Sequence, residues 1–221
     1  MHEREPKGNI MNQRHRYELY QILSESNPKP QTELAFENHF QLLIAVLLSA
    51  QATDISVNKA TKVIFKTIKT PDDLIQMGED NFKAHIKSIG LFNAKARNAL
   101  LTSYILKEKY NGEVPQTRIA LEALPGVGRK TANVVLNEGF GIPTIAVDTH
   151  VFRVANRTGL AKGKTPTKVE EGLEKNTPKI FKQGAHHWLI LHGRYVCKAR
   201  KPLCESCNIK HVCDFYKKNF N

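Results

Sequence analysis

Hydrophobic residues recur along most of this chain at intervals of three and four positions, the spacing of one face of an α-helix. Within residues 60–68 they occupy positions i, i+3, i+4 and i+8, which predicts a helix with one buried face. A broader apolar stripe covers residues 96–105, in a segment without glycine or proline. Leu42–Leu48 is hydrophobic on every side, so it predicts a helix at the centre of a core.

Signals that start helices are also clear, whereas strand signals are almost absent. Thr70-Pro71 and Thr165-Pro166 each place a capping hydroxyl before a proline at the first helical position. Thr144–Val147 is short and has the composition of a β-strand, but the sequence predicts no second strand that could pair with it. About ten helices are expected between residues 10 and 197, which predicts an all-α protein.

Composition limits the classes of protein to which the chain can belong. Its 221 residues are 41% hydrophobic and 24% charged, an ordinary globular composition that argues against a disordered or collagen-like chain. The longest apolar run has seven residues, whereas a membrane span takes about 20. No apolar segment follows Met1–Lys7, so neither a secretory signal nor a membrane partner is expected, and the protein is predicted to be cytoplasmic.

The net charge has two interpretations. Lysine and arginine number 33 against 21 acidic residues, which gives a formal charge of +12. A solvated basic surface would account for this charge without any ligand. A nucleic-acid partner would also account for it, because lysines and arginines near phosphates release condensed counterions.

The four cysteines all lie in the last 25 residues. Their spacing is Cys-x6-Cys-x2-Cys-x5-Cys, and the preceding 196 residues contain no cysteine. Because they crowd into one tail and do not link distant segments, they predict a single metal centre and not a disulfide framework. Four cysteines can hold zinc or an iron–sulfur cluster, and the spacing alone leaves both open.

A glycine-containing turn is a candidate anion site. In the segment Leu124–Ala132 (LPGVGRKTA), a short helix over 118–123 is expected to end before the glycines, and a second helix to begin near Arg129. Backbone N–H groups and the positive end of the second helix would converge on this turn. Contacts with phosphate position a protein on DNA without reading its sequence. The alternative is an ordinary connection between two helices.

Several segments together resemble one protein family. Besides Leu124–Ala132 and the cysteine tail, they are Val147–Val154 (VDTHVFRV), Ser49–Asp54 and Gly90–Ala96. In these segments the chain resembles the helix–hairpin–helix DNA glycosylases and, within them, the endonuclease III family. The resemblance covers residues 16–213, and the first dozen residues match no segment of the family.

The resemblance implies two helical lobes and an activity. Residues 31–141 would form a six-helix bundle with the helix–hairpin–helix motif, and residues 1–30 and 142–221 would form an iron–sulfur cluster lobe. The implied activity is base-excision repair by a DNA glycosylase and abasic-site lyase. It would remove oxidised pyrimidines from duplex DNA and cleave the strand 3′ to the abasic site by β-elimination. The expected partner is damaged double-stranded DNA, bound by a monomer associated with the nucleoid.

Lys130 and Asp148 are the catalytic residues that the resemblance implies. The Lys130 amine would attack the sugar C1′, expel the base and form a Schiff base. Only the neutral amine can attack, and a helix N-terminus, desolvation and Arg129 would each disfavour the ammonium form. Asp148 would stabilise positive charge on the sugar and assist proton transfer, although an aspartate before the expected helix 149–156 can also serve as an N-cap. His150 is expected to be structural.

Four further residues are implied to contact DNA. Gln51 and Leu91 would fill the gap left by the extruded base, which must leave the stack before the amine can reach C1′. The alternative for Leu91 is packing in a core. Gly126 and Gly128 would let the backbone of the turn approach a phosphate.

The cysteine tail is implied to hold a 4Fe-4S cluster, with all four cysteines, Cys197, Cys204, Cys207 and Cys213, as ligands. Between the first two, Lys198, Arg200 and Lys201 would grip phosphate. Alternatively, these cations only offset the negative charge of the thiolates. Tyr195 and the cluster His186–Trp188 are expected to pack within the same lobe.

Two rival functions remain. The adenine-removing mismatch glycosylase of the same superfamily lacks a lysine at the position of Lys130 and carries an additional carboxy-terminal domain, whereas this chain ends eight residues after Cys213. A non-catalytic helix–hairpin–helix module would bind DNA or RNA without chemistry. The presence of both Lys130 and Asp148 argues against such a module.

Overall fold

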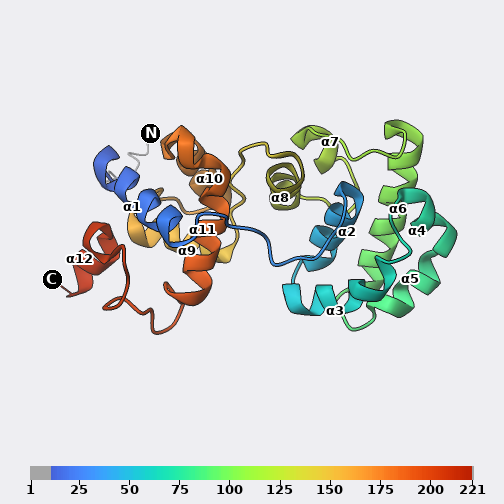
Figure 1. Ribbon diagram of the computed structural model, residues 1–221, viewed down its shortest axis with the longest axis horizontal. Coiled ribbons are helices and arrows are strands. Elements are labelled where there is room, and N and C mark those ends of the chain that lie inside the picture. Colours follow the sequence, from blue (N-terminus) through green and yellow to red (C-terminus); the bar gives the residue numbers. More distant parts are fainter. Residues whose placement is uncertain (1–10, 221) are drawn as a thin grey trace, which may run out of the picture. The chain divides into compact units, whose positions relative to one another are not determined.

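A computed structural model describes residues 11–220, and every regular element within that range is a helix (Figure 1). The predicted all-α class is therefore confirmed. Most of the first dozen residues, which matched no family segment, lie outside this range. Between residues 11 and 220, no helix has both the length and the apolar character needed to cross a membrane.

The chain forms two compact units by its internal contacts. One is the continuous segment Gln31–Ile142, and the other combines the chain up to Pro30 with the chain from Pro143 onward. The first unit contains seven helices: α2 (His39–Ser49), α3 (Asp54–Ile64), α4 (Pro71–Met77), α5 (Glu79–Ile86), α6 (Phe92–Tyr110), α7 (Arg118–Glu122) and α8 (Arg129–Phe140).

The centre of the first unit is α2, as the all-round hydrophobic run predicted. Every residue from Phe40 to Leu48 is buried, and the helix packs against α3, α6 and α8. The unit has seven helices where six were predicted. Gly78 accounts for one additional helix, because it ends α4 and begins α5 with a φ of 77°. This left-handed conformation favours glycine and divides the helical segment in two.

The second unit brings the two ends of the described chain together. Its helices are α1 (Gln13–Ser26), α9 (Thr149–Thr158), α10 (Pro166–Asn176), the 3₁₀ turn η1 (Lys179–Phe181), α11 (Lys182–Tyr195), the 3₁₀ turn η2 (Lys210–Val212) and α12 (Asp214–Phe220). Leu19 and Tyr20 of α1 join one core with Val151 and Leu189. The Tyr20 hydroxyl also lies 2.9 Å from the Thr177 hydroxyl, which ties α1 to the distant carboxy-terminal part.

Both predicted helix starts are present. Thr70 and Thr165 are N-caps whose hydroxyls accept hydrogen bonds from the backbone N–H groups of Asp73 and Lys168. The Asp73 carboxylate in turn accepts from the Thr70 N–H at 2.8 Å, which completes a capping box. These local signals set helix ends independently of the core.

The β-like segment Thr144–Val147 is buried but extended, and no strand is found among the described residues. The Ala146 carbonyl lies 2.8 Å from His186 Nδ1, so a side chain takes the place that a neighbouring strand would occupy. His187 is buried as well, and Trp188 donates to the Asn27 carbonyl at 2.9 Å. His186, His187 and Trp188 therefore pack in the unit, as expected.

Candidate active site and metal centre

The turn between α7 and α8 is built around Gly126. Its φ is 76°, and a Cβ on this residue would lie 2.7 Å from the Asn98 Nδ2 of α6. Thr102, one turn further along α6, donates its hydroxyl to the Pro125 carbonyl at 3.2 Å. The Val127 N–H closes the turn on the Leu124 carbonyl at 3.1 Å. The backbone conformation therefore favours glycine at position 126, and any larger residue would also displace the Asn98 side chain.

Gly128 plays a different part in the same turn. It is the N-cap of α8 with a φ of −93°, it supplies no side-chain cap, and nothing lies within 4 Å of where its Cβ would be. The sequence indicated that both glycines are needed for the hairpin, but only Gly126 is needed for its geometry. At Gly128 the missing side chain leaves open space beside the N-cap of α8, the helix end at which an anion can approach free N–H groups.

Lys130 occupies the first turn of α8 and is exposed. Its position beside a helix N-terminus agrees with the expectation. The expected desolvation is not supported, because Lys130 is exposed.

Gln51 and Leu91 share an unusual backbone conformation. Their φ angles are 55° and 61°, in the left-handed region that is uncommon for non-glycine residues. Each lies in a turn directly before a helix, Gln51 before α3 and Leu91 before α6. Leu91 is 60% exposed, so the alternative of core packing is wrong for this residue.

Asp148 is the N-cap of α9, as the sequence suggested. Its Oδ1 accepts hydrogen bonds from the backbone N–H groups of His150 and Val151, both at 2.8 Å. Within the described chain no hydrogen bond engages its second oxygen, and the residue is half-buried. His150 Nδ1 lies 3.2 Å from the Arg153 guanidinium, a contact that agrees with the expected structural role.

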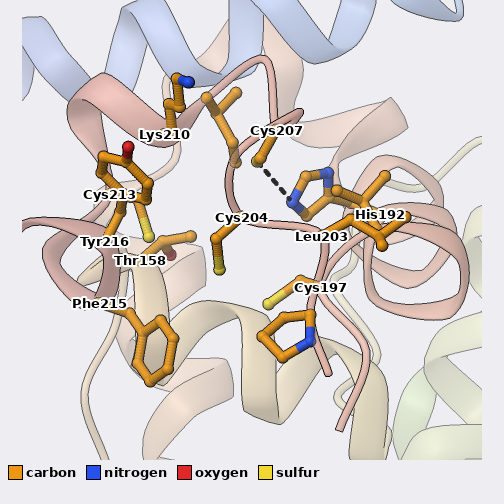
Figure 2. A pocket seen from close by; sticks show the side chains of 13 residues that line it. Thr158, His192, Cys197, Leu203, Cys204, Cys207, Lys210, Cys213, Phe215 and Tyr216 are labelled. Atoms are coloured by element: carbon orange, nitrogen blue, oxygen red, sulfur yellow. Dashed lines mark hydrogen bonds between the residues drawn. The ribbon is translucent and has the colours of Figure 1, made fainter. Parts of the chain in front are cut away.

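The four cysteines line one pocket in the second unit (Figure 2). Leu203, Phe215 and Tyr216 line it too, so aromatic and aliphatic groups surround the sulfur atoms. In residues 11–220 no three His, Cys, Asp or Glu side chains are grouped to hold a metal ion. Four thiols that line one pocket are a donor set that both a structural zinc ion and an iron–sulfur cluster accept.

Burial disfavours the thiolates that a cluster requires. It raises the pKa of the Cys207 thiol to about 11 and also raises the pKa values of Cys204 and Cys213. A bound metal reverses this effect because its positive charge stabilises the coordinating thiolates. The donor set and its surroundings therefore fit an iron–sulfur cluster.

Three residues around the cysteines were not found from the sequence. Arg157 of α9 donates to the Lys198 carbonyl at 2.7 Å, to the Ala199 carbonyl at 3.1 Å and to Cys197 Sγ at 3.5 Å. Arg153, one turn earlier, donates to the Cys197 carbonyl at 2.8 Å. The available signal was weak, because the predicted helix 149–156 contained Arg153 but ended one residue before Arg157.

The third missed residue is His192. Its Nε2 lies 3.7 Å from Cys207 Sγ, the contact dashed in Figure 2. Burial lowers the pKa of His192 to about 4, so the ring is neutral at pH 7 and can direct one N–H toward sulfur. No sequence signal separated it from other histidines in the same helix.

The basic loop after Cys197 presents its cations to solvent. Lys198, Arg200 and Lys201 are all exposed, and Lys201 has a φ of 50°. The loop is closed by a hydrogen bond of 3.0 Å from the Leu203 N–H to the Val196 carbonyl. Tyr195, the last residue of α11, is 57% exposed, which is more than the expected packing in the lobe implies.

Two family profiles match the chain. One is described as an HhH-GPD superfamily base excision DNA repair protein and covers residues 44–179. The other is the iron-sulfur binding domain of endonuclease III and covers residues 197–213. The second match begins and ends on a cysteine of the tail. The cofactor is therefore the predicted 4Fe-4S cluster, and the zinc alternative is wrong.

Whole-chain relatives agree with the profiles. Endonuclease III of Escherichia coli strain K12 is 59% identical over 208 residues, which are 94% of this chain and 99% of that protein. The structure of a trapped endonuclease III–DNA covalent intermediate is 44% identical, with a TM-score of 0.88 and coverage of 96% of this chain and 100% of that one. A non-covalent endonuclease III–DNA complex is 45% identical, with a TM-score of 0.88 and coverage of 95% and 98%. The chain belongs to the endonuclease III family of the helix–hairpin–helix superfamily, base-excision repair enzymes that act as DNA glycosylases and abasic-site lyases.

Proposed function

We propose that Lys130 and Asp148 perform the removal of oxidised pyrimidines and the subsequent strand cleavage on damaged double-stranded DNA. The observation that carries this proposal is the exposed Lys130 amine in the first turn of α8. It follows a turn whose conformation is fixed by Gly126 and by its contacts with α6. A nucleophile on a rigid helix start is held in place while its amine stays accessible to a sugar.

Lys130 acts as a nucleophile in both steps. Its neutral amine forms a bond to C1′, the glycosidic bond breaks, and the bonding pair leaves with the base, which takes up a proton. Loss of the amine proton and opening of the sugar ring give an imine. Removal of a C2′ proton then expels the 3′ phosphate by β-elimination, and water releases the lysine.

Asp148 divides its two oxygens between structure and chemistry. Oδ1 caps α9 through two hydrogen bonds of 2.8 Å, which fix the carboxylate in one orientation. The second oxygen is left to stabilise positive charge on the sugar and to take part in the lysine proton transfers. The N-cap interpretation and the catalytic interpretation of this residue therefore apply together.

The DNA contacts come from the turns. The open space at Gly128 and the start of α8 receive a backbone phosphate, and Gly126 maintains the turn that forms this space. Gln51 and Leu91, exposed in left-handed turns, occupy the gap that the extruded base leaves. Filling this gap offsets part of the few kcal/mol that extrusion costs.

The cluster has a structural role, which is to position the basic loop, and it takes no part in bond breaking. Cys197, Cys204, Cys207 and Cys213 hold it, and it supplies a rigid crosslink for the carboxy-terminal tail. Arg157 fixes the backbone of the loop, and Lys198, Arg200 and Lys201 project outward to contact phosphates.

DNA is the partner that the charge and the relatives support. The formal charge is +12, and two structures of similar fold are described as endonuclease III–DNA complexes. The enzyme acts as a monomer on chromosomal DNA, in the cytoplasm and in association with the nucleoid.

Strand cleavage on defined duplexes tests this proposal. Holoenzyme is incubated with duplexes that carry one thymine glycol, one abasic site or no lesion. We expect cleavage of the first two only. Asp148→Asn should slow cleavage by about 10²-fold at nearly unchanged stability, because asparagine is an equally good N-cap. A wild-type protein that binds these duplexes without cleaving either lesion would support the non-catalytic module instead.

A further inference from the structure

Lys95 is a buried cation that the mechanism above does not use. It is 5% exposed, and its Nζ has no hydrogen-bond partner among the residues that the structure describes. Burial lowers the pKa of its ammonium group. A buried polar group without a partner is costly, so this side chain reduces the stability of the free protein.

The geometry of α6 directs the Lys95 side chain back toward the Leu91 turn. Lys95 is the fourth residue of α6, and helical side chains lean toward the N-terminus of their helix. That N-terminus begins at Leu91 with a φ of 61°, without a side-chain cap and without an acidic residue in the first turn. Unengaged N–H groups and a buried cation therefore converge on one helix end, and its first turn holds no carboxylate to neutralise them.

The same face of α6 supports the hairpin turn. Asn98 and Thr102, three and seven positions after Lys95, contact Gly126 and Pro125. A shift of three or seven positions keeps residues on one side of a helix. Lys95 therefore lies on the face of α6 that carries the Leu124–Gly128 turn, on the side nearer to Leu91.

We propose that Lys95 and the N-terminus of α6 form a second phosphate site, which binds a phosphodiester oxygen of the DNA strand when Leu91 enters the duplex. This inference rests on the DNA-binding function proposed above. This site requires the Lys95 side chain to turn outward when DNA binds. Because the free protein already bears the desolvation of this amine, pairing it with phosphate gains more than pairing a solvated surface lysine.

Lys95→Met separates binding from stability. Methionine keeps the unbranched apolar stem and removes the amine. We expect the melting temperature of the holoenzyme to rise by about 2–4 °C. On a duplex with a chemically reduced abasic site, which cannot form a Schiff base, we expect about tenfold weaker binding, the loss of one charge-assisted hydrogen bond. The slope of log K against log salt should fall by about 0.9.

Lys109→Met is the matched control. Lys109 is exposed in the last turn of the same helix, so its loss removes the same charge far from Leu91, and neither affinity nor slope should change beyond a small nonspecific effect. An unchanged slope for Lys95→Met, with wild-type cleavage intact, would overturn the second phosphate site alone. A fall in melting temperature without a change in slope would assign Lys95 to packing. Failure of the wild-type protein to bind DNA would overturn both proposals.

Discussion

The Leu91 turn and the Gly126 turn make the same kind of reversal between two helices with different residues. Each places one left-handed residue before or near the start of a long helix, with φ angles of 61° and 76°. Space for a side chain at Gly126 is taken by the Asn98 side chain of α6, whereas at Leu91 the side chain is present and the residue is 60% exposed. A left-handed leucine costs about 1–2 kcal/mol, which glycine would avoid.

The difference separates two ways of contacting a ligand. At the Gly126 turn the backbone is the functional part, and side chains are absent where the chain must be close to another group. At the Leu91 turn the chain keeps a strained left-handed backbone, and the side chain is exposed to solvent. Gln51 and Lys201 follow the second pattern, since both are exposed with φ angles of 55° and 50°. Strain of this kind is concentrated at functional sites.

Gly126→Ala should have the largest effect on stability. A methyl group would meet Asn98 at 2.7 Å in a conformation that alanine disfavours. We expect a loss of about 2–3 kcal/mol in the free energy of unfolding, measured by denaturant titration, and slower strand cleavage because Lys130 follows this turn.

Gly128→Ala is the control for that change. It adds the same methyl group two residues away, where φ is −93° and no atom lies within 4 Å. Its loss of stability should stay below about 1 kcal/mol, the scale of an unfavourable N-cap. Equal losses at both positions would remove the distinction between the two glycines.

Leu91→Gly should raise the stability of the protein and lower its cleavage rate, whereas Gly126→Ala should lower both. Relief of the left-handed strain should raise the free energy of unfolding by about 1 kcal/mol. Loss of the side chain should lower the cleavage rate at thymine glycol about tenfold, because nothing then fills the gap beside the extruded base. Both quantities are measured on the same preparation.

Asn111→Gly is the corresponding control, since Asn111 is also left-handed, with a φ of 52°, and caps the far end of α6. It should change stability slightly and leave cleavage unaffected. A Leu91→Gly protein that cleaves at the wild-type rate would show that the Leu91 side chain does not contribute to cleavage.

The sequence predicted local features of the fold and site, and it failed where distant segments meet. Helix starts at Thr70 and Thr165 depend on the nearest few residues, so they could be predicted. The extended segment Thr144–Val147 is completed by His186, some forty positions away, which no local pattern contains. Exposure of Tyr195 was missed for the same reason.

Within the site, the motifs identified the residues expected to touch ligands. They did not identify the neighbouring residues that hold those side chains and turns in position. The cysteines and the hairpin glycines form recognisable strings. Arg157, His192 and Asn98 act through contacts that bridge 15 to 41 residues of sequence or through the close approach of two elements. Only the folded chain shows them. The exposure of Lys130 was likewise hidden, because an exposed and a desolvated lysine look alike in a motif.

Covalent trapping with borohydride tests the central assignment most directly. Borohydride reduces a Schiff base, so holoenzyme mixed with a duplex containing thymine glycol or an abasic site should become irreversibly attached to the DNA. Lys130→Gln should bind these duplexes with an affinity similar to wild type and give no adduct, while Lys109→Gln should trap like wild type. A Lys130→Gln protein that traps as efficiently as wild type would assign the nucleophile to another amine and contradict this account.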